Sequence, residues 1–284
     1  MNGDVPFAWR ERRVRSAGAS VAVYEAGGGD GAPPVLLLHG LGHWADAAWR
    51  PLVSHLDGAR RYVAVDLPGF GASDKPDVRY DAEYFRETVL DVADALDLDR
   101  FVLVGHSLGG FIAADVGATE PARVSHLALI APAGFTRVPR HIAASLVARV
   151  LGTLVVGGVP SRRLVRRIVD RAVADRMAID EATFERAYAL ACERGVRRAF
   201  VGVYAAATDV LTGRAALHAR FARYAGPVFC AWGKQDRYIP VRALDAVVRV
   251  YPRASTLVLD GSAHLPMVEE PRALARALDA FLRA

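Results

Sequence analysis

A serine at the centre of the pattern G-x-S-x-G, Ser107 in residues 105–109, is the residue whose setting most clearly predicts chemistry. An apolar run, 101–104, precedes the pattern, and small and apolar residues, 110–114, follow it. In this strand–turn–helix setting the pattern exposes a nucleophile, because glycines at its ends remove the Cβ atoms that would collide on a sharp, strained turn. Ser107 is the predicted nucleophile; the alternative is an ordinary glycine-rich turn between a strand and a helix.

A serine nucleophile needs a base, and the chain holds 8 histidines. His264 lies in a turn-rich loop, 260–266, between the last predicted strand and the last predicted helix. Doubly wound sheets place their sites in loops at the carboxyl ends of strands, which makes His264 the predicted base. His106 is next to the serine, but adjacent side chains point apart, so we expect His106 to be structural.

The base needs an orienting acid, and two aspartates compete for that role. Asp236 follows the predicted strand 228–232 and gives the chain order Ser, Asp, His. Asp260 is nearer to His264 in sequence, but it ends a strand and could merely fix its own loop. The turn after the predicted strand 124–130 has no carboxylate. Asp236 is therefore the predicted acid.

Short apolar runs predict the strands that must hold these residues. Their alternation with helical patterns predicts an α/β fold with a mostly parallel sheet and helices on both faces. Asp81 can cap a helix whose apolar residues recur at helical spacing, and 271–282 is the predicted closing helix. The predicted strands are 14–16 and 21–24, which form an opening hairpin, then 35–38, 62–65, 101–104, 124–130, 228–232 and 256–259.

The alternation of strands and helices breaks between about 133 and 223, where one helical pattern follows another. Core strands resume afterwards, so this segment is predicted to be an insertion. Within it, residues 142–160 are almost wholly apolar, but Arg149 and several glycines interrupt them and a proline ends them. That stretch is short and poorly flanked for a membrane span. We predict a cap helix over a pocket and no stable membrane insertion.

Charge and cysteine content argue against several classes of function. The net charge is +5 and no run of like charges occurs, so nucleic acid is not an expected partner. Cys192 and Cys230 show neither zinc spacing nor a need for a disulfide, and Cys230 is expected to be a buried free thiol. The N-terminal residues include no apolar signal segment, so the expected location is cytoplasmic.

The motifs and their order along the chain resemble those of the α/β-hydrolase superfamily. The resemblance rests on residues 39–42, 66–73, 105–109 and 232–236 and on the loop around His264. It implies the α/β-hydrolase fold, with an eight-stranded, mostly parallel sheet formed by residues 1–134 and 224–284. Residues 135–223 would then form the inserted helical cap. The resemblance also implies that the turn 39–42 brings the backbone N–H of Leu41 beside that of Leu108.

These assignments together predict a covalent mechanism. His264 takes the proton of Ser107, whose oxygen attacks a carbonyl carbon, and Asp236 holds the imidazole in the correct tautomer. The resemblance implies that the N–H groups of Leu41 and Leu108 form the oxyanion hole. Water then hydrolyses the acyl-enzyme. This chemistry requires no metal and no organic cofactor.

A serine at position 107 excludes relatives such as haloalkane dehalogenases and epoxide hydrolases, which use aspartate there. The apolar cap favours an esterase that acts on a small hydrophobic substrate. Hydrophobic residues beside the predicted catalytic loops and at the start of the cap are the expected substrate contacts: Trp44, Leu265, Met267 and Phe135.

Other functions remain open, because the fold does not decide among them. The runner-up is a carbon–carbon bond hydrolase of the meta-cleavage type, in which an arginine of the cap would hold a substrate carboxylate; Arg194, Arg197 and Arg198 are the candidates. Thioesterase, lactonase and cofactor-free perhydrolase activities are further alternatives. A ligand-binding receptor with little or no turnover is the alternative outside enzymology.

Overall fold

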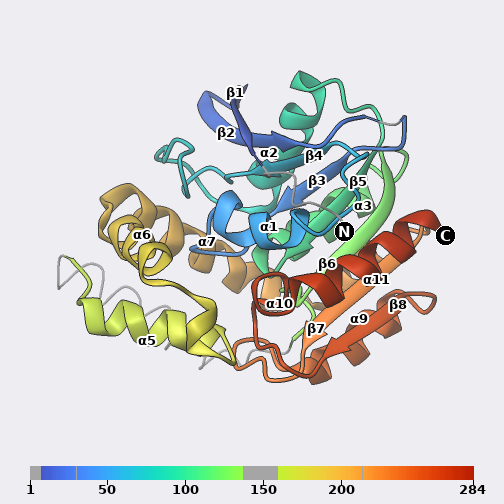
Figure 1. Ribbon diagram of the computed structural model, residues 1–284. Coiled ribbons are helices and arrows are strands. Elements are labelled where there is room, and N and C mark those ends of the chain that lie inside the picture. Colours follow the sequence, from blue (N-terminus) through green and yellow to red (C-terminus); the bar gives the residue numbers. More distant parts are fainter. Residues whose placement is uncertain (1–7, 30, 137–158, 213) are drawn as a thin grey trace.

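The computed structural model describes residues 8–29, 31–136, 159–212 and 214–284, and its core is one eight-stranded sheet (Figure 1). The strand order is β1-β2-β4-β3-β5-β6-β7-β8. Only the β1–β2 and β2–β4 pairs are antiparallel, and the others are parallel, so the predicted sheet is confirmed. The strands are β1 (Arg10–Ser16), β2 (Ala19–Ala26), β3 (Val35–Leu38), β4 (Tyr62–Val65), β5 (Phe101–His106), β6 (Val124–Ile130), β7 (Val228–Gly233) and β8 (Ser255–Leu259).

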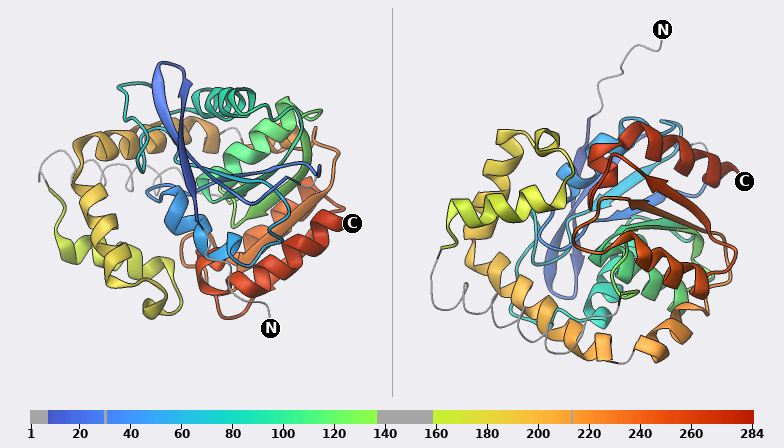
Figure 2. Two further views of the ribbon diagram at one scale, coloured as in Figure 1. Left: turned by 45° about the horizontal axis from the view of Figure 1, so that its top comes forward. Right: turned by 90° about the horizontal axis from the view of Figure 1, so that it is seen from below.

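Helices cover both faces of the sheet (Figure 2). Successive residues of a strand point to opposite faces, so Leu36 and Leu38 of β3 join one apolar cluster, and Val35 and Leu37 join the other. Burial on both faces explains why the central strands are continuously apolar. The first cluster contains α2 (Ala82–Ala95), α3 (Leu108–Thr119) and α9 (Leu244–Val250), and the second contains α1 (Ala45–Val53), α10 (Pro266–Glu269) and α11 (Pro271–Arg283).

Helix α2 begins where the sequence predicts, because the side chain of Asp81 accepts a hydrogen bond from the backbone N–H of Tyr84. Strand β1 begins at Arg10, earlier than the predicted 14–16. It is an edge strand whose first four residues are exposed and charged. An edge strand that is exposed in this way carries no apolar run at its start, so a prediction from apolar residues places the start of β1 too late.

The described chain between β6 and β7 is helical and contains no strand. Its helices are α5 (Arg162–Ala172), α6 (Glu181–Cys192), α7 (Arg194–Thr212) and α8 (Arg214–Phe221), with a 3₁₀ turn at Arg176–Ala178. Helices α5 and α6 lie beside the sheet rather than on it (Figure 1). We call residues 162–192 the side lobe. The predicted cap limits, 135–223, stay a prediction, and residues 137–158, which hold nearly all of the predicted apolar cap helix, lie outside the described residues.

Helix α8 follows α7 in the chain and packs on the core. Leu217 and Phe221 belong to the first apolar cluster, and Arg220 pairs with the fully buried Asp115 of α3. Arg86 of α2 donates to the same carboxylate at 2.9 Å. This buried carboxylate therefore joins three helices, and its charge is offset by two guanidinium groups.

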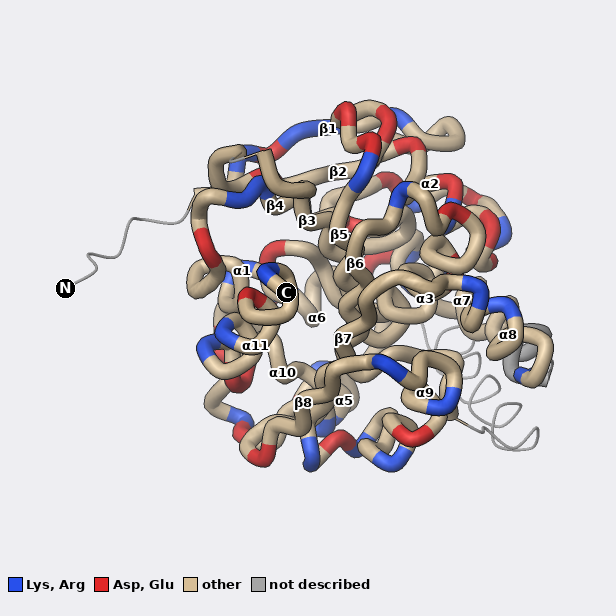
Figure 3. Tube along the Cα trace, turned by 90° about the vertical axis from the view of Figure 1, so that its right-hand side faces the viewer, with Lys and Arg blue, Asp and Glu red and all other residues tan. Residues whose placement is uncertain are grey.

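Charged residues of both signs are spread over the outer helices and loops, as Figure 3 shows for one side of the molecule. None of the helices within the described ranges combines the length and the apolar character that crossing a membrane requires. Cys230 lies buried in β7, where burial raises the pKa of its thiol, and both cysteines are free, as predicted.

Candidate active site

Ser107 occupies the sharp turn between β5 and α3. Its φ is 52° and its ψ is −110°, an unfavourable conformation for a residue with a Cβ atom. The flanking glycines make the turn possible. A Cβ on Gly105 would lie 2.2 Å from the carbonyl oxygen of Gly109, and a Cβ on Gly109 would lie 2.1 Å from that of Leu38. The strained elbow therefore depends on glycine at both positions.

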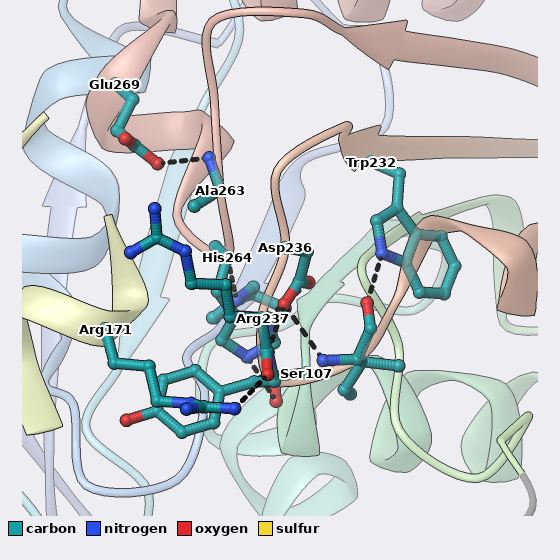
Figure 4. Close-up of polar contacts among 11 residues, drawn as sticks. Ser107, Arg171, Trp232, Asp236, Arg237, Ala263, His264 and Glu269 are labelled. Carbon is teal, nitrogen blue, oxygen red and sulfur yellow. Dashed lines mark hydrogen bonds and ion pairs between the residues drawn. The ribbon is translucent and has the colours of Figure 1, made fainter. Parts of the chain in front are cut away.

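Three loops bring together the three residues that the sequence predicts as a triad (Figure 4). Ser107 follows β5, Asp236 follows β7 and His264 follows β8. The Nε2 atom of His264 lies 3.1 Å from Ser107 Oγ, and its Nδ1 atom lies 2.7 Å from Asp236 Oδ2. In this geometry the carboxylate holds a proton on Nδ1 and leaves Nε2 free to accept the serine proton.

The carboxylate of Asp236 is fixed on both of its oxygens. Its side chain is fully buried, and Oδ1 accepts the backbone N–H groups of Tyr238, at 2.7 Å, and Ile239, at 2.9 Å. These bonds leave Oδ2 for His264. The rival Asp260 points to solvent instead, with a side chain that is 80% exposed and paired with Lys234 at 2.7 Å. Asp236, not Asp260, is placed to orient the imidazole.

The turn 39–42 lies directly against Ser107. A Cβ on Gly40 would be 3.2 Å from the Cβ of Ser107. Buried His39 holds the turn, since its Nδ1 contacts the Gly40 carbonyl at 2.8 Å and its Nε2 accepts the N–H of Leu67 at 3.0 Å. Burial lowers the pKa of His39 to about 4, so this ring is neutral at pH 7.

The two predicted oxyanion-hole residues flank the elbow. Leu108 is the first residue of α3, where backbone N–H groups have no partner within the helix. Within the described residues, the N–H groups of Leu41 and Leu108 donate to no other protein group. Two free donors beside a nucleophile are what a developing oxyanion requires, and this role stays a prediction.

His106 contacts the base, although the sequence predicts only a structural role for it. Its Nε2 lies 2.8 Å from the carbonyl oxygen of His264, and the two ring centres are 4.8 Å apart. Burial, and next the nearby His264, lower the pKa of His106 well below its ordinary value. A neutral His106 therefore donates to the backbone of the base and fixes its loop from the sheet side.

Two aromatic residues that the sequence analysis missed lie beside His264 and beside the turn 39–42. The ring of Tyr238 lies 5.4 Å from that of His264, and its hydroxyl donates to the carbonyl of Ile168 in α5 at 2.8 Å. Phe200 of α7 lies against the turn 39–42, because a Cβ on Gly42 would be 3.2 Å from its ring. Tyr238 could have been found from Asp236, since an aspartate often accepts the N–H two residues later.

The four predicted substrate contacts lie in different places. Trp44 stacks on His43 at 5.3 Å and lines an open cleft of about 350 Å³, whose lining includes Asp66 and Arg186 but none of the three triad residues. Phe135 is buried against Phe221 and Tyr251. Leu265 and Met267 are buried in the second apolar cluster. Their part in substrate binding stays a prediction.

Two of the three arginines proposed to hold a substrate carboxylate contact other groups in this structure, and the third is exposed. Arg197 donates to the carbonyls of Ala191 and Cys192 at the end of α6. Arg198 donates to the carbonyl of Lys75 and pairs with Asp77, and Arg194 is exposed. Within the residues the structure describes, no cluster of three His, Cys, Asp or Glu side chains could hold a metal ion.

Comparisons with known proteins agree with the fold. A family model described as the alpha/beta hydrolase fold matches residues 33–271. A 2-hydroxymuconate semialdehyde hydrolase of Pseudomonas sp. (strain CF600) is 28% identical over 95% of this chain and 93% of its own.

A dihydrolipoyllysine-residue acetyltransferase component of the acetoin cleaving system of Pseudomonas putida is 30% identical over 90% of this chain and 65% of its own. Among solved structures, a membrane phospholipase A superposes with a TM-score of 0.77 at 26% identity, over 97% of this chain and 86% of its own. The match to the family model covers far more than half of the sequence, and the chain belongs to the α/β-hydrolase family.

Proposed function

We propose that this α/β hydrolase is a serine hydrolase that cleaves an ester, or a related acyl bond, of a small hydrophobic substrate through an acyl-enzyme on Ser107. His264 removes the serine proton across the 3.1 Å contact and later protonates the leaving group. Asp236 stabilises the imidazolium that forms meanwhile. The N–H groups of Leu41 and Leu108 stabilise the oxyanion, and each such donor contributes about 3–4 kcal/mol in related chemistry.

The observation that carries the ester proposal is the placement of the three candidate arginines, two of which are engaged and one of which is exposed. A meta-cleavage substrate carries a carboxylate, which needs a cation to balance it in a buried site. Arg197 and Arg198 already donate to backbone carbonyls, and Arg194 is exposed to solvent. The rings of Tyr238, beside His264, and Phe200, beside the turn 39–42, suit a neutral apolar acyl group better than a charged one.

Carbon–carbon bond hydrolysis is the second candidate, and the similarity to 2-hydroxymuconate semialdehyde hydrolase over almost the whole chain favours it. The same serine, histidine and aspartate would serve in that reaction. One position for an anion is beside Arg171, whose guanidinium lies 5.6 Å from the ring centre of Tyr238. A carboxylate there would compete for a side chain that already donates to the Arg237 carbonyl.

A direct comparison of substrates tests the proposal. We expect p-nitrophenyl esters from C2 to C12 to be hydrolysed, with kcat/KM rising about fourfold per methylene until the pocket is full, because each buried CH₂ contributes roughly 0.8 kcal/mol. A meta-cleavage dienoate, measured in parallel, should be turned over at least about a hundredfold more slowly by kcat/KM.

Other outcomes separate the alternatives. A faster reaction with the dienoate would replace the ester proposal with the carbon–carbon one. Thioester and peracid assays on the same preparation test the thioesterase and perhydrolase alternatives. A fluorophosphonate that labels Ser107 without any turnover of the panel would favour a ligand-binding receptor. Labelling of another residue would refute the assignment of the nucleophile.

A further inference from the structure

The end of helix α5 in the side lobe touches both loops that carry the acid and the base. On the acid loop, Arg171 donates to the carbonyl of Arg237 at 2.9 Å, next to Asp236. On the base loop, the backbone N–H of His264 donates to the carbonyl of Ala172 at 2.8 Å. Figure 4 shows Asp236 and His264 close to Ser107. The side lobe is thus joined to the loops of Asp236 and His264 by one side-chain and one backbone hydrogen bond.

One side chain completes this attachment. Glu269 of α10 accepts the N–H of Ala263 on Oε2 at 2.8 Å, and that residue directly precedes His264. Its other oxygen, Oε1, accepts the N–H groups of Ala174 at 2.5 Å and Asp175 at 3.4 Å, just beyond α5. All of these partners are donors, which matches a carboxylate with acceptors at both ends. No mechanistic step uses this carboxylate.

We propose that Glu269 is a positioning residue for His264, because its two oxygens tie the base loop to the side lobe and so set the contact between His264 and Ser107. The inference rests on the proposed serine-hydrolase function. The His264 loop is then held from two sides: His106 binds the His264 carbonyl from the sheet, Ala172 of the side lobe accepts the His264 N–H, and Glu269 of α10 accepts the Ala263 N–H. A shift of about 1 Å in a catalytic group can cost on the order of 10²-fold in rate.

Glutamine at position 269 separates this role from simple space filling. The amide keeps the shape but has one oxygen, so its NH₂ group must face a backbone N–H at one end of the bridge. Glu270 offers a matched control in the same turn. Among the described residues, its Oε2 accepts the hydroxyl of Ser262, at 2.6 Å, and a glutamine oxygen can accept that bond equally well. Glu270→Gln changes the charge by the same amount without touching the side lobe.

The experiment measures kcat and KM of the wild-type protein, Glu269→Gln and Glu270→Gln with C2 and C8 p-nitrophenyl esters. We expect Glu269→Gln to lose at least about tenfold in kcat, equally for both esters, and to label with fluorophosphonate more slowly by a similar factor. Glu270→Gln should stay within about twofold of wild type. A loss restricted to the C8 ester would assign Glu269 to the pocket wall and overturn the proposal, and so would an unchanged kcat.

Two further comparisons keep the outcome decisive. If Glu269→Gln melts below the assay temperature, Glu269→Asp replaces it: the shorter carboxylate keeps both acceptors but cannot span the bridge. An equal loss of kcat with both esters then supports the proposal, and wild-type kcat overturns it. A wild-type protein that neither turns over the esters nor reacts with fluorophosphonate would refute the proposed function itself. An inactive variant of an active wild-type protein would leave the proposed function standing.

Discussion

Substitution of Asp236 by asparagine tests the proposed triad most sharply. Asparagine can keep its oxygen on the N–H groups of Tyr238 and Ile239, which now lie 2.7 and 2.9 Å from Oδ1. Its NH₂ group then faces Nδ1 of His264, 2.7 Å from the present Oδ2. A donor at that place forces the proton onto Nε2, which points at Ser107 and can no longer accept the serine proton.

The expected loss in kcat is about 10⁴-fold, or roughly 5 kcal/mol of transition-state stabilisation. The assay is kcat for a p-nitrophenyl ester, with the melting temperature as a check that the variant is folded. Asp260→Asn is the matched control, since its exposed pair with Lys234 supports no catalytic group, and kcat should stay within about twofold. The assignment would be refuted if Asp236→Asn lost less than about tenfold in kcat, or if Asp260→Asn lost more kcat than Asp236→Asn.

Three other predictions concern the elbow and the buried histidines. Ser107→Ala should lose on the order of 10⁶-fold in kcat, and a variant with more than a trace of activity would point to another nucleophile. Gly109→Ala should lower the free energy of unfolding by about 3 kcal/mol or more in urea titrations, because its Cβ would lie 2.1 Å from a backbone oxygen, whereas Gly29→Ala, with open space around it, should change little. Burial lowers the pKa of His39 from 6.5 to about 4, so between these pH values the unfolded chain binds a proton that the folded chain does not. The free energy of unfolding should therefore fall as the pH drops from about 6.5 towards 4, by up to roughly 1.4 kcal/mol per pH unit from this residue. A free energy of unfolding that stays constant over this pH range would contradict the prediction.

The sequence predicted the sheet, and it singled out three residues that the structure brings into contact, because each depends on a local pattern. Central strands are buried on both faces and stand out as apolar runs, and the elbow needs glycine at 105 and 109 whatever the rest of the chain does. Asp236 could be preferred over Asp260 because it follows the strand 228–232, whereas Asp260 ends a strand and could merely fix its own loop. The exposed first residues of β1 carry no such pattern, and their assignment failed for that reason.

The contacts around the triad could not be predicted in this way. Glu269 reaches residues about a hundred positions earlier in the chain, and it binds backbone N–H groups that every residue except proline has. No residue type at Ala172 or Ala174 indicates that its backbone meets the base loop. His106 was expected to be structural because its side chain points away from that of Ser107, yet that direction leads to the backbone of His264.

The bond between the His264 amide and the Ala172 carbonyl makes the amide hydrogen of the base a reporter of the side lobe. If α5 lifts away, that amide meets solvent and exchanges with deuterium, so its exchange rate measures how often the lobe opens, in an unmodified protein without substrate. Because a carbonyl oxygen is present whatever side chain stands at 172, drift in the sequence of α5 can reshape the neighbourhood of the site while this attachment persists.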